Sequence, residues 1–109
     1  MNVADLNEEK VAEVLTYLAT TDTRYAKAKA DLEASEILRK RVRAKWFLAS
    51  EGTAGERNAE AETHDESQAA DDAYIKALAE FEELKAKRQR GELIIEVFRT
   101  LEASRRRVS

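Results

Sequence analysis

The stretch ADDAYIKALAEFEELKAKRQRGELIIEVF, residues 70–98, decides the fold class. Along it, mostly apolar residues recur at alternating spacings of three and four, the pattern of one face of a long α-helix. These positions are Ala70, Tyr74, Ala77, Phe81, Leu84, Arg88, Gly91, Ile95 and Phe98. Because the stripe is narrow and its surroundings are charged, it predicts a coiled-coil-like seam against a second helix.

A matching stripe lies upstream, in residues 22–50. Its members are Tyr25, Ala28, Leu32, Ser35, Val42, Trp46 and Ala49, and Arg39 interrupts it. The segment between the stripes, about 51–65, is polar and contains two of the three glycines. We therefore predict an antiparallel hairpin of a helix at about 22–50 and a helix at about 65–107. In this pairing Leu48 lies beside Ala69, and Tyr25 lies near Glu92.

A shorter helix, about 7–20, is predicted before the hairpin, with Asn7 as its N-cap. It should end near Thr20, where Thr21 or Asp22 can cap the next helix. Its apolar face should cover the part of the last helix that extends beyond its partner. That part contains Ile94, Val97, Phe98 and Leu101. The expected fold is thus an all-α hairpin of two long helices with a shorter N-terminal helix packing on the C-terminal overhang, in a single domain, 1–109.

The start of the last helix has two candidate signals, because Thr53 with Glu56 and Thr63 with Glu66 both match a capping box. The helix could begin near Ala54 or near residue 64. We favour a short helical turn after Thr53, a break, and a long helix from about residue 65.

Composition excludes several classes of protein. The chain has no proline and no cysteine, and 38% of its residues are charged, which is typical of long helices and rules out disulfides and thiolate zinc sites. The N-terminus lacks the features of a secretory signal, and no apolar run is long enough to span a membrane. We expect a cytoplasmic protein with no membrane partner.

No motif in the sequence points to catalysis. His64 is the only histidine and lies in the polar turn. Neighbouring carboxylates such as Asp71 and Asp72 point in different directions on a helix, so they are poor metal ligands. We expect no enzyme activity, no metal site and no cofactor.

Charge is segregated along the chain. Residues 51–83 contain eleven acidic and two basic residues, whereas residues 23–50 and 84–109 each contain eight basic and three acidic ones. The basic residues predict an anion site at the open end of the hairpin and at the C-terminus. The candidate nucleic-acid-binding residues are Arg24, Lys27, Lys29, Lys87, Arg88, Arg90, Arg105, Arg106 and Arg107. An alternative is that the last arginines complement the helix dipole and that the acidic first helix neutralises them.

Three large apolar neighbours, Trp46, Phe47 and Leu48, cannot all face one seam. Either they form a partner-binding anchor or the turn segment folds back over them.

Residues 38–107 resemble a group of small helical proteins encoded by tailed bacteriophages and prophages. The likeness lies in EGTAGERNAEAE, DDAYIKALAEFEELKAKR and IIEVFRTLEASRRR, and its most specific part is Ile95–Arg107. The resemblance implies an accessory early-region product close to replication and recombination functions in a bacterial host cell. It implies no defined activity.

Two hypotheses follow. The first is a non-catalytic accessory of nucleic-acid metabolism that binds single-stranded or duplex DNA, or a recombination partner, through its basic end. The second is an adaptor, or an inhibitor of a host or defence enzyme, that uses the acidic segment 51–83 and the Trp46 region. Self-association is compatible with either hypothesis, because a second copy would help to bury an apolar seam this narrow.

Overall fold

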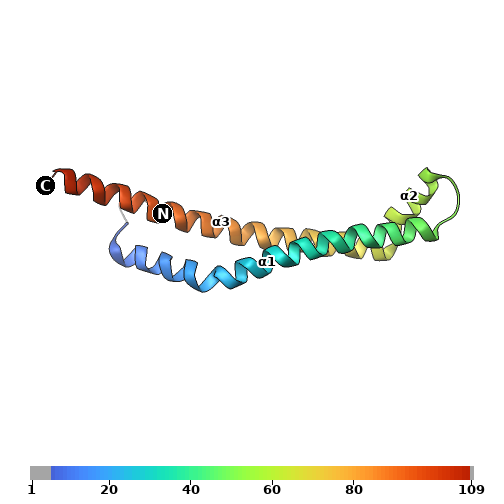
Figure 1. Cartoon of the computed structure of the whole chain (residues 1–109), viewed down its shortest axis with the longest axis horizontal. Coiled ribbons are helices and arrows are strands. Elements are labelled where there is room, and N and C mark those ends of the chain that lie inside the picture. The colour runs from blue at the N-terminus through green and yellow to red at the C-terminus, as the bar shows by residue number, and fades with distance from the viewer. Residues whose placement is uncertain (1–5, 109) are drawn as a thin grey trace. The chain divides into compact units, whose positions relative to one another are not determined.

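The protein is all-helical, as the sequence predicts. The computed structural model describes residues 6–108 and contains three helices, α1 (Glu8–Ala49), α2 (Ala54–Thr63) and α3 (Asp65–Val108) (Figure 1). The chain divides into two compact units. The described residues of the first, 6–25 and 83–108, are here called the terminal unit, and residues 26–82 are called the central unit. The single domain expected from the chain length stays a prediction.

Both predicted seams are confirmed by burial. Every position of the α3 stripe, from Ala70 to Phe98, is buried or half-buried. On α1 the stripe from Tyr25 to Trp46 is likewise buried or half-buried, and only its last predicted member, Ala49, is exposed. The alternating spacing thus identifies the inward face of each long helix.

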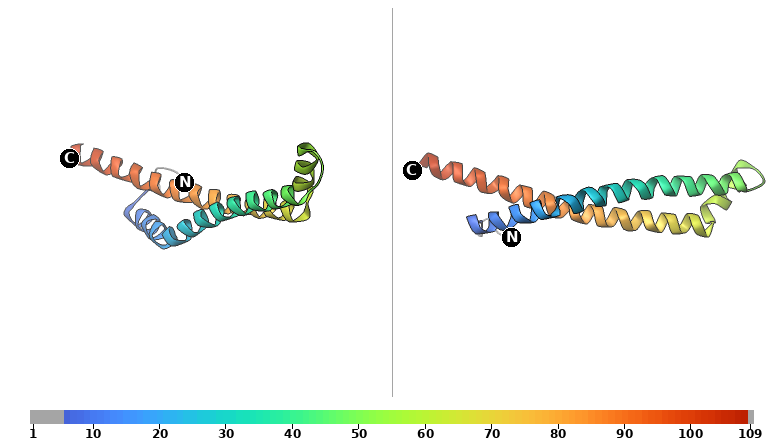
Figure 2. Two further views of the ribbon diagram at one scale, coloured as in Figure 1. Left: turned by 45° about the vertical axis from the view of Figure 1, so that its right-hand side comes forward. Right: turned by 60° about the horizontal axis from the view of Figure 1, so that its bottom comes forward.

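In the central unit, α1 and α3 form the predicted antiparallel pair (Figure 2). The Arg39 Nε donates to Asp71 Oδ1 at 2.8 Å, and Lys45 Nζ lies 3.1 Å from Glu66 Oε2. The predicted alignment would place Arg39 opposite Leu78, whereas the structure pairs it with Asp71. The prediction was therefore wrong by seven residues of α3, roughly two helical turns. The shift arises because the connection is partly helical, and the end of α1 extends past the first turn of α3.

The connection begins with a tight turn at Gly52, whose φ of 109° lies in the left-handed region that favours glycine. Thr53 then caps α2, because its side-chain oxygen accepts the Glu56 amide at 3.2 Å. Arg57 of α2 returns to α1 and donates from Nε to the Phe47 carbonyl at 3.1 Å. This segment therefore folds over the end of α1.

The long helix α3 begins at Asp65, as favoured from the sequence. The second predicted capping box does not form, because the Thr63 hydroxyl donates to the Ala59 carbonyl one turn back at 2.8 Å. Instead the His64 Nδ1 accepts the Glu66 amide at 3.1 Å. His64 therefore caps α3 in place of Thr63.

At the start of α1, the predicted N-cap is confirmed. The Asn7 Oδ1 accepts the Lys10 amide at 2.8 Å, and the Asn7 carbonyl accepts the Val11 amide at 3.0 Å. These bonds satisfy backbone groups that a helix start otherwise leaves free.

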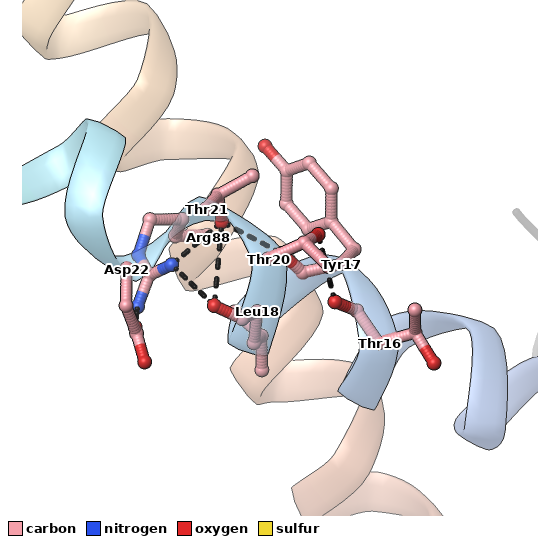
Figure 3. A network of polar contacts seen from close by, with 7 residues as sticks. All are labelled: Thr16, Tyr17, Leu18, Thr20, Thr21, Asp22 and Arg88. Carbon is pink, nitrogen blue, oxygen red and sulfur yellow. Dashed lines mark hydrogen bonds and ion pairs between the residues drawn. The ribbon is translucent and has the colours of Figure 1, made fainter.

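The predicted end of this first helix near Thr20–Asp22 was wrong, because α1 continues without a break to Ala49. The Thr20 and Thr21 hydroxyls donate to carbonyls one turn earlier, at 2.9 and 2.7 Å, instead of accepting an amide as a cap would (Figure 3). Asp22 also does not cap, since its carboxylate accepts a hydrogen bond from Arg88. These threonines remain compatible with a helix interior because their hydroxyls bond within it.

Arg88 joins α3 to α1 inside the terminal unit. Its Nη1 donates to the Leu18 carbonyl at 2.9 Å and to the Thr21 hydroxyl at 2.6 Å, and its Nη2 pairs with Asp22 (Figure 3). The guanidinium also lies 5.0 Å from the centre of the Tyr25 ring. Only 13% of the Arg88 side chain is exposed. It is therefore a packed member of the seam.

Close packing between the helices continues at Gly91. A Cβ at this position would lie 3.1 Å from Cγ1 of Val14 and 3.6 Å from Cδ2 of Leu18. By this antiparallel alignment, Glu8 lies level with Val97, and α3 continues beyond the start of α1 (Figure 1). The first turns of α1 therefore cover the predicted overhang only in part.

We predict that Arg88→Ala lowers the free energy of unfolding by about 2 kcal/mol, because it removes hydrogen bonds from a charged, mostly buried group. Urea denaturation followed by circular dichroism measures the change. Arg90→Ala is the matched control, because Arg90 is exposed and its replacement should cost less than about 0.5 kcal/mol. Equal losses in the two variants would contradict the role given to Arg88.

Candidate functional site

The basic residues predicted to bind nucleic acid are distributed over both compact units. Lys27 and Lys29 belong to the central unit. The others belong to the terminal unit: Arg24, Lys87, Arg88, Arg90, Arg105, Arg106 and Arg107. We therefore describe the candidate site within the terminal unit.

Two of the predicted lysines form ion pairs with carboxylates one turn away. Lys27 Nζ lies 2.7 Å from Asp31 Oδ2, and this hydrogen bond raises the pKa of Lys27 above its ordinary value. Lys87 Nζ lies 3.1 Å from Glu83 Oε1. Both lysine side chains remain more than half exposed. Exposed pairs of this kind are weak, so they leave the lysines able to exchange partners.

Arg88 has a different position from the one the charge pattern suggested. Its donors are used by the backbone of Leu18 and the side chains of Thr21 and Asp22. The structure thus places Arg88 in the seam, where it supports neighbouring residues and does not face solvent.

A groove between α1 and α3 brings two other predicted residues together. Its volume is about 300 Å³. It is lined by Lys10, Glu13, Val14 and Tyr17 of α1 and by Lys87, Arg90, Gly91 and Ile94 of α3. We call it the cationic groove, because three of these residues carry positive charge and one carries negative charge. Its size is near the lower limit for small-molecule sites, which fits a phosphate group or an extended chain better than an enclosed ligand.

The groove owes its floor to the close approach of Gly91 and Val14. Helical spacing then sets its walls, because Lys10 and Tyr17 lie two turns apart on α1, and Lys87, Arg90 and Ile94 follow one another by about one turn on α3. Glu13 is paired with Lys10 at 3.6 Å, which offsets part of the positive charge.

The same face of α3 continues toward the C-terminus with apolar residues and a further arginine. Seven and eleven residues after Ile94 come Leu101 and Arg105, and this spacing keeps them on one side of the helix. Two shallow hollows lie here, the first lined by Leu93, Glu96, Val97, Thr100 and Leu101 and the second by Leu101, Ser104, Arg105 and Val108.

The three final arginines do not form one patch. Arg105 lies on the groove side of α3 and is 2.8 Å from Glu102. Arg106 and Arg107 are exposed, and as consecutive residues they point to other sides of the helix. All three lie in the last turn, where positive charge complements the helix dipole. Of the tail, only Arg105 extends the face of the cationic groove.

The Trp46 region is covered by the connection between the long helices. The ring centres of Trp46 and His64 are 3.5 Å apart and their planes differ by 16°, so the rings are stacked. Trp46 Nε1 donates to Glu66 Oε2 at 2.8 Å, and Lys45 Nζ lies 5.0 Å from the centre of the Trp46 ring. Trp46 is therefore half-buried within the central unit.

The neighbours of Trp46 differ in exposure. The Arg57 guanidinium lies 4.3 Å from the centre of the Phe47 ring and partly covers it. Leu48 is 74% exposed. Of the predicted apolar anchor, Leu48 alone is largely accessible to solvent.

Some contributors were missed in the sequence. Lys10 and Tyr17 were not singled out, although their seven-residue spacing places them on the same side of the first helix. His64 was taken as a plain turn residue, and its cap and its stack on Trp46 have no local signal in the sequence. Among residues 6–108, no group of three or more His, Asp or Glu side chains could hold a metal ion.

No family model, curated protein or solved structure matches the chain. In the part of the chain that the structure describes, none of the helices combines the length and apolar character needed to cross a membrane.

We predict that acid changes the emission of Trp46, the only tryptophan. Hydrogen bonds from the Trp46 indole and the Lys45 ammonium lower the pKa of Glu66. The contribution of these contacts to stability is therefore complete at neutral pH and is lost as the pH falls below about 4. A fluorescence titration from about pH 7 to pH 3 should show this transition.

Glu66→Gln should remove the transition, because an amide oxygen can accept the indole N–H without titrating. Glu62→Gln is the control, since Glu62 is an exposed carboxylate of α2. Identical titration curves for the two variants would show that Glu66 does not report through Trp46.

Proposed function

We propose that the protein is a non-catalytic accessory of phage nucleic-acid metabolism that binds the phosphate backbone of DNA through the cationic groove. The observation that carries the proposal is the presence of Lys10, Lys87 and Arg90 around one open groove. The resemblance of residues 38–107 to small phage and prophage proteins supports the phage setting.

Phosphate binding is the chemistry that this groove fits. Lysine and arginine neutralise phosphates and release counterions from the nucleic acid, which supplies affinity without sequence recognition. Tyr17 adds a half-buried aromatic ring to the same groove, and such rings stack on unpaired bases. This combination favours single-stranded over duplex DNA.

The α3 face gives the groove a direction along the helix. Arg90 and Arg105 are fifteen residues apart in the sequence, which corresponds to about 22 Å along a helix. Ile94 and Leu101 lie between them on that face. A strand bound along it would meet phosphate-binding groups at both ends and apolar surface in the middle.

The net charge of −3 and the carboxylate of Glu13 in the groove work against tight binding. We therefore expect affinity that depends strongly on ionic strength. For single strands, the logarithm of the binding constant falls with the logarithm of the salt concentration with a slope of about −0.7 per neutralised phosphate. Three or four contacts predict a slope between about −2 and −3.

We predict that Lys87→Glu/Arg90→Glu weakens binding to a labelled single strand at least about tenfold at 50 mM salt and lowers the salt slope. Fluorescence anisotropy at about 50 and 200 mM salt measures both quantities, and circular dichroism checks the fold. Arg105→Glu tests whether the site extends along α3.

The matched control is Lys76→Glu/Lys40→Glu, which makes the same change in net charge at exposed positions of the central unit. It should retain most of the affinity. Absence of binding at 50 mM salt, or equal losses in the groove and control variants, would rule out the groove as a DNA site.

A second candidate function is protein binding as an adaptor or an inhibitor, favoured by the 74% exposure of Leu48 beside the acidic segment. Here Leu48→Ser should abolish the capture of a partner by affinity purification from host cells. Ile75→Ser, at another exposed aliphatic residue, should preserve it. If both variants still capture the partner, Leu48 is not the anchor.

A further inference from the structure

The helix α1 carries a second stripe at heptad spacing, separate from its seam. Its members are Ala30, Ala34, Ile37, Arg41, Ala44 and Leu48. All six lie in the central unit and all are exposed. Ile37 is 50% exposed and Leu48 is 74% exposed. We call this set the outer stripe.

The outer stripe lies on the opposite side of α1 from the seam. Each member follows a half-buried or buried seam residue by two positions, as Ile37 follows Ser35 and Leu48 follows Trp46. Two residues rotate an α-helix by about 200°. The helix α1 therefore carries two stripes at heptad spacing on opposite faces, and α3 packs against only one of them.

We propose that the outer stripe is an interface with a second copy of this chain, with the two α1 helices packed antiparallel. Three alanines in the stripe allow the backbones to approach closely, and Ile37 and Leu48 supply larger apolar groups. The identity and the orientation of the occupant follow from the charges beside the stripe.

On one flank, Leu38 lies midway between Asp31 and Lys45, seven residues from each. Leu38 is 54% exposed. If two copies pair antiparallel with Leu38 at the centre, Asp31 of each copy lies level with Lys45 of the other. Leu38 then meets its own counterpart.

On the other flank, Glu36 and Lys40 lie two residues before and after the same centre. Antiparallel pairing about Leu38 therefore also places Glu36 of each copy level with Lys40 of the other. Residues on one flank stay on that flank in such a pair. In a parallel pair in register the two flanks face each other instead, which places Lys45 of each copy near Lys40 of the other, two like charges.

Asp31 and Lys45 already pair with Lys27 and Glu66, and Glu36 pairs with Lys40 one turn away. These pairs are largely exposed and weak, so association exchanges them for intermolecular pairs.

Arg41 is the one charged residue of the outer stripe. In the antiparallel pair it lies between the levels of Glu33 and Ile37 of the other copy. Its aliphatic stem covers Ile37 and its guanidinium reaches the Glu33 carboxylate. An arginine at this position therefore favours antiparallel self-pairing over a uniformly apolar partner.

The test uses the absence of cysteine from the chain, which makes single cysteines clean reporters. Leu38→Cys should form a disulfide-linked dimer under mild oxidation at about 100 μM protein. Ala30→Cys should not, because in the antiparallel pair the two residues 30 are about 24 Å apart along the helices, beyond the reach of a disulfide. Ile75→Cys, exposed on α3, should also remain monomeric in denaturing gels.

Equilibrium sedimentation of the wild type should show a dimer at about 100 μM. Lys40→Glu should raise the dissociation constant at least about tenfold, and Glu36→Lys/Lys40→Glu should restore it to within about threefold, because the exchange preserves both intermolecular pairs. Circular dichroism confirms that each variant is folded.

A monomer at that concentration would overturn the proposal. Preferential linkage through Ala30→Cys would show a parallel pair, and equal linkage through Leu38→Cys and Ile75→Cys would show unspecific collision. Failure of the charge exchange to restore association would place the interface elsewhere. Each result is independent of DNA binding, which is measured on the cationic groove.

Discussion

The arrangement of the terminal unit depends on one guanidinium group, that of Arg88. Its donors reach a carbonyl, a hydroxyl and a carboxylate within a little more than one turn of α1, at Leu18, Thr21 and Asp22. An apolar seam of repeating spacing can slide by a heptad with little change in buried area, whereas a set of directed hydrogen bonds cannot. Arg88 therefore fixes the alignment of α3 on α1 within the terminal unit. This alignment decides which residues face each other across the cationic groove.

The central unit uses the same principle at two levels. Arg39 occupies a seam position and bonds to Asp71, while its guanidinium lies 4.8 Å from the centre of the Tyr74 ring. Nearer the connection, Glu66 receives the Trp46 indole N–H. Polar groups at seam positions contribute less to stability than apolar ones would, but they define which residues face each other. The narrow seam predicted from composition is thus compatible with one defined pairing.

The sequence was sufficient for features that depend on local periodicity and insufficient for those that depend on contacts between distant residues. The inward faces of α1 and α3 and the Asn7 cap follow from neighbouring residues and were predicted. The start of α3 was predicted at the right residue, but from a Thr63 capping box that does not form. The predicted helix break near Thr20 was wrong because the same threonine hydroxyl can cap a helix or bond inside one, and Arg88 and the surrounding packing decide between them.

The predicted alignment of the two long helices was wrong because it depends on α2 and on Arg88. The spacing predicted Arg88 on the seam and the charge count predicted it at the anion site, and its hydrogen bonds to Leu18, Thr21 and Asp22 place it on the seam. At the candidate site, Lys87 and Arg90 were predicted, whereas Lys10 and Tyr17 depend on an alignment that the sequence does not supply.

The three acceptors around Arg88 also constrain how this chain can diverge. Lysine would keep the charge at position 88, but its single ammonium cannot span acceptors that the planar guanidinium reaches from two nitrogens. We therefore expect positions 21, 22 and 88 to change together in distant relatives, either as a Thr-Asp-Arg set or as an apolar replacement of all three. Asp22 and Arg88 are sixty-six residues apart in the sequence. A coupled change at such distant positions would identify relatives even where the rest of the sequence resembles that of any charged helix.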